Sequence, residues 1–139
     1  MGDWKAWFSF SGRAARRQYW RTLLLLIGIS FALSALGVIP GGQIIAMPFS
    51  LAANIAQWAL VARRLHDLGR SGWWQVPAMA LGMAAVLQVV SMGQSGIEAR
   101  PDIAAAMLGA MFLSMAFVVV IGVVRGDPGP NRWGPPPAR

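Results

Sequence analysis

Residues 63–74, which read RRLHDLGRSGWW, bring together the side chains of this chain that could do chemistry. The only histidine, His66, precedes Asp67, and arginines stand on both sides of this pair. A histidine base needs an orienting acceptor and a nucleophile or water to activate. Ser71 is near in sequence, but no G-x-S-x-G elbow is present. We therefore predict no catalytic residue, and interpret His66 as a helix-end residue and Asp67 as locally paired.

Metal binding also has little support in the sequence. One histidine, no cysteine and five scattered acids provide no set of three closely spaced ligands. Met107, Met111 and Met115 recur every four residues, and thioethers can hold Cu(I). Methionines at helical spacing are more typical of packing. We predict neither a metal nor a cofactor.

The composition indicates a membrane protein of one domain. Of the 139 residues, 56% are hydrophobic and only 12% are charged, against about 25% charged residues in soluble globular proteins. Four stretches contain no charged residue or histidine, namely 22–39, 42–62, 73–93 and 103–124. About 20 apolar residues cross a bilayer core as a helix. We expect an all-α protein built as a bundle of four transmembrane helices.

The basic residues predict the orientation of this bundle. If the chain crosses four times, eleven of the twelve Lys and Arg residues fall on one side, and only Arg100 falls on the other. The positive-inside rule assigns the basic side to the cytoplasm, with both termini inside. Topology alone accounts for the net charge of +7, so we predict no nucleic-acid partner.

The expected organisation has three parts. Residues 1–18 form an interfacial N-terminal segment, residues 19–126 the membrane domain, and residues 127–139 a proline-rich cytoplasmic tail, extended or turned. Trp4, Trp7 and Phe8 share a helical face, Ser11-Gly12 breaks that element, and helical spacing then resumes. The residues with that second spacing are Arg13, Arg16, Arg17 and Trp20.

The link between the second and third stretches reads as a tight helical hairpin. Gly69 stands where a C′ glycine ends a helix, and Asp67 lies within reach of Arg63 or Arg64 for a local ion pair. Ser71 can cap the next helix. Trp73 and Trp74 then begin the third span at headgroup level, where indole rings are enriched, and Pro77 falls early in that helix as a first-turn proline or a mild kink. We expect Trp133 of the tail to dock at the membrane.

Three blocks carry a resemblance to a known family: FSFSGRAARRQYW at 8–20, RRLHDLGRSGWW at 63–74 and PGPNRWG at 128–134. In order and spacing they resemble the domain of unknown function 805 family, and they extend over nearly the whole chain. This resemblance implies a small multi-pass protein of the bacterial cytoplasmic (inner) membrane. It implies no catalytic residue, because no activity is assigned to the family.

Polar residues within the spans suggest a different function. Asn54 and Gln57 lie one turn apart, and Gln88 lies in the third span. They could line a small-solute channel or transporter in a homo-oligomer, although such side chains more often bond to neighbouring helices. The small-residue pairs Ala78/Gly82 and Ala105/Gly109 favour close helix packing within the bundle or between copies.

The leading hypothesis is non-enzymatic. All three blocks reach the same membrane face, and a strong preference for arginine over lysine suits contacts with phosphate. We expect this face to bind anionic phospholipid headgroups, another anion or a partner protein, while simple anchoring and orientation would explain the charges equally well. A channel subunit is the first alternative, and a lipid-modifying enzyme using His66 and Asp67 is the second. The candidate anion-site residues are Arg13, Arg16, Arg17, Arg63, Arg64, His66, Asp67, Arg70, Trp73, Trp74, Asn131 and Arg132.

Overall fold

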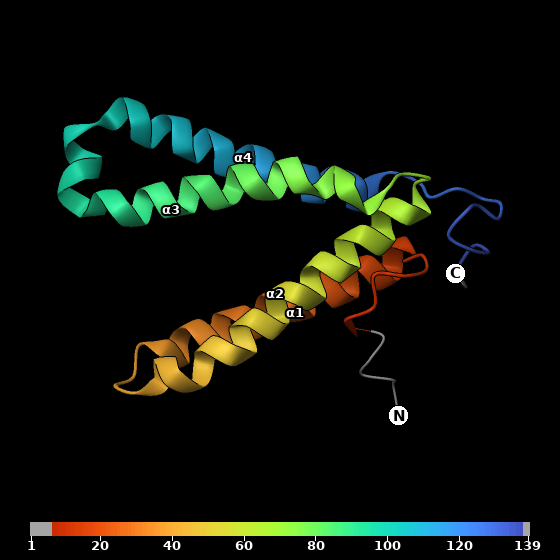
Figure 1. Ribbon diagram of the computed structural model, residues 1–139, viewed down its shortest axis with the longest axis horizontal. Helices are drawn as coiled ribbons and strands as arrows, with labels where there is room; N and C mark the ends of the chain where they lie inside the picture. Colours follow the sequence, from red (N-terminus) through yellow and green to blue (C-terminus); the bar gives the residue numbers. More distant parts are fainter. Residues whose placement is uncertain (1–6, 138–139) are drawn as a thin grey trace. The chain divides into compact units, whose positions relative to one another are not determined.

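The computed structural model describes residues 7–137, with the side chains of residues 94, 95, 97 and 99 left aside. It is all-α apart from its connections (Figure 1). In order, the elements are α1 (Arg16–Gly37), α2 (Gly42–Asp67), the 3₁₀ turn η2 (Gly72–Gln75), α3 (Val76–Ala99) and α4 (Pro101–Val123). The four α-helices correspond to the four predicted spans, and each is long and apolar enough to cross a membrane.

The chain divides into two compact units. The first contains α1, α2, the segment up to Gly72 and the tail from Val124 onward; the second is Trp73–Val123. In the first unit α1 and α2 lie side by side (Figure 1). Gly41, with φ +79°, makes the turn between them, because glycine adopts this left-handed conformation without steric cost.

Small residues let the two helices of the first unit approach each other. Ala46, Ala53 and Ala56 of α2 and Leu23 and Leu26 of α1 are all less than a tenth exposed. Large apolar side chains point outward instead, with Phe31 74% and Ile44 82% exposed. An outward apolar surface of this kind belongs in hydrocarbon, where it needs no burial against protein.

In the second unit α3 packs along α4. The hydroxyl of Ser114 donates to the carbonyl of Ala78 at 2.9 Å, and a Cβ at Gly82 would lie 3.1 Å from the same hydroxyl oxygen. The close packing predicted for the Ala78/Gly82 pair is therefore confirmed. At Gly109 a Cβ would meet nothing within 4 Å, so the Ala105/Gly109 pair makes no such contact within the described part of this chain, and its packing between copies stays a prediction.

The link after α2 confirms the predicted helix end and the predicted first-turn proline. Helix α2 continues to Asp67, and Gly69 follows with φ +71°, as a C′ glycine does. Pro77 lies in the first turn of α3. One detail differs, because α3 begins at Val76 and not at Trp73, so Ser71 precedes the 3₁₀ turn and not the α-helix. A single 3₁₀ turn is a common start to a helix.

The N-terminal segment departs further from expectation. Trp4 lies outside the described residues, and residues 8–15 contain no helix. Gly12 has φ +86°, in keeping with the predicted break. Helix α1 begins only at Arg16. The prediction that Arg13 lies on the same helix as Arg16, Arg17 and Trp20 is therefore wrong. Arg13 instead extends from an irregular segment and is 8% exposed.

Candidate functional site

The site is built at the C-terminal end of α2, where a helix leaves its last carbonyl groups without partners in the helix. Here other segments of the first unit supply them. Asp127 of the tail donates its backbone N–H to the carbonyl of Asp67 at 2.8 Å, and Ala14 donates to the carbonyl of Arg63 at 3.0 Å. The side-chain amide of Asn131 donates to the carbonyl of His66 at 3.0 Å. The three sequence blocks therefore meet at one helix end.

Arg13 reaches this helix end from the N-terminal segment. Its Nε donates to Oδ1 of Asp67 at 3.0 Å, and its Nη2 lies 2.9 Å from the same oxygen. The remaining guanidinium donors go to the tail, to the carbonyl of Gly129 at 2.7 Å and that of Asp127 at 2.6 Å. Its side chain is only 1% exposed. One arginine thus joins residues more than 110 positions apart.

Arg64 approaches the same carboxylate from within α2. Its Nη1 lies 2.5 Å from Oδ2 of Asp67 and also donates to the carbonyl of Ala14 at 3.1 Å. Its Nη2 donates to the carbonyl of Val124, at the start of the tail. The residue is fully buried. The planar fork of a guanidinium suits such a position, because it holds several acceptors in fixed directions.

Asp67 is shared by both guanidinium groups, and Arg13, Asp67 and Arg64 are called the Arg–Asp–Arg cluster below. Each carboxylate oxygen faces one arginine, and the residue is 4% exposed. A buried carboxylate is stable only when it is paired and hydrogen-bonded. Sequence spacing predicted a local pair of Asp67 with Arg63 or Arg64, and the structure shows Arg64; the bond to Arg13 was not predicted.

The tail folds onto this cluster through a tight turn. Asn131 and Gly134 form a two-way backbone bridge, at 3.1 and 2.9 Å, around Arg132 and Trp133. The carbonyl oxygen of the Asn131 side chain accepts the backbone N–H of Trp133 at 3.0 Å. An asparagine that bonds to the backbone two residues on is typical of turns. The tail is extended and turned, as predicted.

His66 and Trp133 form the second contact between α2 and the tail. Their rings stack with centroids 4.6 Å apart and planes 11° from parallel, while the guanidinium of Arg132 lies 3.9 Å from the centre of the indole ring. Trp133 thus packs on a histidine of its own chain, and its docking at the membrane stays a prediction. Nδ1 of His66 lies 3.1 Å from the carbonyl oxygen of Gly12. Since a carbonyl only accepts, Nδ1 carries the proton in this contact.

The contacts of His66 and Asp67 bear on whether this pair could act in catalysis or hold a metal ion. His66 and Asp67 are neighbours in sequence, but the ring of His66 is engaged with Gly12 and Trp133, and the oxygens of Asp67 are engaged with arginines. Across residues 7–137, no three acidic or histidine side chains are grouped so that they could hold a metal ion.

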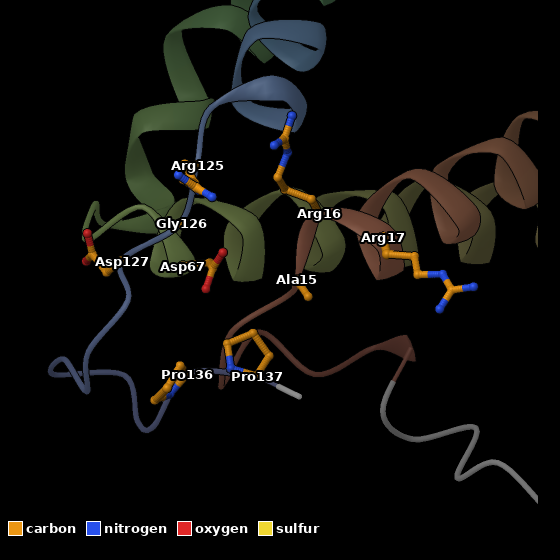
Figure 2. Close-up of a pocket in the computed structure, with 9 residues that line it drawn as sticks. All are labelled: Ala15, Arg16, Arg17, Asp67, Arg125, Gly126, Asp127, Pro136 and Pro137. Atoms are coloured by element: carbon orange, nitrogen blue, oxygen red, sulfur yellow. The ribbon is translucent and has the colours of Figure 1, made fainter. Parts of the chain in front are cut away.

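A cavity of about 270 Å³ opens beside the cluster. Figure 2 shows its lining, which comes from the start of α1, the end of α2 and two stretches of the tail. The lining residues are Ala15, Arg16, Arg17, Asp67, Arg125, Gly126, Asp127, Pro136 and Pro137.

The remaining predicted residues of the anion site are distributed differently. Arg63 is buried, and its Nε donates only weakly, at 3.4 Å, to the carbonyl of Ala59 in its own helix. Arg70 is exposed in the link. Trp73 and Trp74 are 79% and 60% exposed, in the second unit. The structure therefore splits the predicted set into an internal cluster, a cavity rim and exposed residues.

Sequence reasoning missed Arg125, Gly126 and Asp127, which precede the third block. Gly126 passes so close to Asp67 that a Cβ there would lie 1.9 Å from Oδ2. Asp127 accepts a hydrogen bond at 3.2 Å from the side chain of Asn131. The sequence RGDPG offered one signal, since an acid between glycines and prolines is typical of a turn.

The polar residues of the spans are distributed over both units. The side-chain amide of Asn54 donates to the carbonyl of Ser50 in its own helix at 2.8 Å, and Asn54 is exposed. Gln57, one turn later, is half-buried in the first unit, and Gln88 is exposed in the second.

Comparisons with known proteins agree with this architecture. The profile of the family described as "Protein of unknown function (DUF805)" matches residues 7–135. The inner membrane protein YhaH of Escherichia coli strain K12 is 28% identical over 146 aligned positions, which cover 97% of this chain and 96% of that protein. The inner membrane protein YhaI of the same strain is 36% identical over 72 positions, covering 50% of this chain and 61% of that protein. No solved structure matches. The chain therefore belongs to the DUF805 family and is an integral inner-membrane protein with four helices able to span the bilayer.

Proposed function

We propose that this protein is non-enzymatic, that both its termini lie in the cytoplasm, and that its cytoplasmic face binds the headgroups of anionic lipids. The four helices would cross the membrane in alternation as a bundle. The positive-inside bias supports this orientation, because only Arg100 among the twelve basic residues lies in the connection on the opposite side.

The observation that carries lipid binding is the difference between two groups of arginines. Arg13 and Arg64 are buried and have acceptors within the protein. Arg16, Arg17 and Arg125 are exposed and line the cavity, and within residues 7–137 no carboxylate pairs with them. Cations held near the headgroup level attract anionic lipid, at about 1 kcal/mol for each residue near the surface.

This assignment changes the expected ligand site from the link after α2 to the rim of the cavity. Arg63 and Arg64 of the predicted link are poor candidates for a headgroup, because both are buried and Arg64 is committed to the Arg–Asp–Arg cluster. The rim of the cavity, at the start of α1 and in the tail, is the better candidate. The transport alternative gains no support from Asn54, whose amide is bonded within α2.

Lipid-dependent thermal stability of the detergent-purified protein tests the proposal. Phosphatidylglycerol should raise the unfolding temperature more than phosphatidylcholine does, and the triple variant Arg16→Gln, Arg17→Gln, Arg125→Gln should lose that difference. Arg100→Gln is the matched control, since Arg100 is exposed but belongs to the opposite connection. An unchanged response of the triple variant would refute the assignment of the headgroup site.

The orientation has a separate test. A reporter that is active only in the periplasm should be inactive when fused after Arg139 and active when inserted in the connection near Arg100. The opposite pattern would overturn the proposed topology without bearing on lipid affinity.

A further inference from the structure

The cavity beside the Arg–Asp–Arg cluster has an unusual charge balance. Five arginines belong to its lining or to the adjoining cluster, namely Arg13, Arg16, Arg17, Arg64 and Arg125, and two acids oppose them, Asp67 and Asp127. The formal sum is five minus two, or +3. All these residues lie in the first unit, so this sum describes one compact body.

The two acids of this site are already engaged. Both oxygens of Asp67 face guanidinium groups of the cluster, and Oδ2 of Asp127 accepts a hydrogen bond from the side chain of Asn131. The positive charge that remains is therefore concentrated at the rim, on Arg16, Arg17 and Arg125.

The backbone at the cavity adds donors to these cations. Ala15 precedes α1 without a side-chain cap, and no acid stands in the first turn. The first i→i−4 bond of the helix is donated by Tyr19 to Ala15, so the N–H groups of residues 16–18 precede the helical ladder. Ala15, Arg16 and Arg17 all line the cavity, and anions are favoured at such a helix start.

We propose that this cavity binds a phosphomonoester, a ligand with a terminal phosphate group. This inference rests on the proposed headgroup-binding function and specifies its ligand class. A phosphomonoester carries a charge of about −1.5 to −2 and three terminal acceptor oxygens. A phosphodiester carries a single charge and two free oxygens. The excess of +3 and the three arginines of the lining match the dianion better.

The volume sets a limit on what enters. A cavity of about 270 Å³ is slightly smaller than the pockets of about 300–1,000 Å³ that enclose drug-sized molecules. It accommodates a phosphate with a short attached group, and not a nucleotide. Two sources provide such a group: a membrane lipid of the phosphatidic acid type, or a small soluble phosphomonoester.

The experiment compares three ligands on the full-length protein in detergent, measured by native mass spectrometry and by thermal stabilisation. They are phosphatidic acid, phosphatidylglycerol with the same acyl chains, and inorganic phosphate. We expect phosphatidic acid to bind about tenfold more tightly than phosphatidylglycerol, since the monoester makes at least one more charge-assisted hydrogen bond. The Arg16→Gln, Arg17→Gln, Arg125→Gln variant should lose this preference, and Arg100→Gln should keep it.

The outcomes separate the two proposals. Equal binding of both lipids, lost together in the triple variant, would overturn the phosphomonoester inference and leave the headgroup-binding function standing. Binding of inorganic phosphate without phosphatidic acid would support the monoester class and identify a soluble source, against the lipid function. Tight binding of phosphatidic acid that persists in the triple variant would place the site elsewhere and overturn the assignment to this cavity. If neither lipid nor phosphate binds, both proposals are wrong.

Discussion

Arg64 and Asp67, three residues apart at the end of α2, form a buried ion pair in which Nη1 lies 2.5 Å from Oδ2. Arg13 contacts the other oxygen of the same carboxylate at 2.9 Å. One acid therefore separates two buried cations that come from different parts of the chain. Like charges at this depth repel strongly, so the stability of the first unit should depend on Asp67.

Asp67→Asn should strongly destabilise the protein. The amide keeps the shape of the carboxylate but leaves Arg13 and Arg64 without a counter-charge, and breaking a buried pair in this way costs about 3–5 kcal/mol. Denaturant or thermal unfolding in detergent measures the change. Asp102→Asn provides the control, because the Arg100–Asp102 pair is exposed and should contribute nothing measurable. Equal stability of the two variants would contradict the central role of Asp67.

Arg64→Lys should also destabilise the protein, although it keeps the charge. Arg64 divides its donors among the carbonyl of Ala14, Asp67 and the carbonyl of Val124. A compact ammonium cannot reach all three. Loss of the donor to the buried carbonyl of Ala14 and to the partly buried carbonyl of Val124 should cost about 2–3 kcal/mol.

The neighbouring arginine supplies the matched comparison for that variant. Arg63 is also buried, but its Nε makes only a 3.4 Å contact with the carbonyl of Ala59 in its own helix. Arg63→Lys should therefore be nearly neutral in the same unfolding assay. If both lysine variants lose the same stability, the cost reflects the burial of an arginine at either position. It would then not reflect the three hydrogen-bond acceptors that Arg64 contacts.

The helices were predictable because one physical constraint dominates them. A stretch without charges that is long enough to cross hydrocarbon must satisfy its backbone internally, which only a helix does here. The ends were less predictable. Helix α1 begins at Arg16, six residues before the predicted span at residue 22, because charged residues at headgroup level can extend a helix without cost to burial.

The cluster was only partly predictable. The bias of basic residues indicates which side they share, and this says nothing about which of them are buried. Spacing on one helix indicated a local pair of Asp67 with Arg63 or Arg64, since residues three or four apart are neighbours, and the structure selects Arg64. The Arg13–Asp67 bond spans 54 positions and depends on the path of an irregular segment, which no local pattern encodes. Helical spacing even assigned Arg13 to the wrong element.

Trp133→Ala should loosen the tail without unfolding the helices. The substitution removes the stack on His66 and the cation–π contact with Arg132, with an expected loss of about 1–2 kcal/mol. Trp133→Phe is the control, because phenylalanine retains a ring to stack. Hydrogen exchange at the backbone N–H groups of positions 133 and 134 in this variant is compared with wild type. Limited proteolysis should cleave the alanine variant faster within the tail. An alanine variant as resistant as wild type would show that the backbone bonds alone hold the tail.

Gly126→Ala should displace the tail from the end of α2. The added Cβ would lie 1.9 Å from Oδ2 of Asp67, so either the backbone or the carboxylate must move, at a cost of about 1–3 kcal/mol. The backbone N–H of Asp127, now bonded to the carbonyl of Asp67, should then exchange faster with solvent.

Gly129→Ala is the matched control for this last variant. It adds the same methyl group three residues further along the tail, where a Cβ would meet nothing within 4 Å. The carbonyl of Gly129 can still accept from Arg13, because the substitution leaves the backbone intact. Exchange at Asp127 should therefore stay at the wild-type rate. Equal acceleration in both alanine variants would mean that tail flexibility, and not the close approach to Asp67, controls the docking.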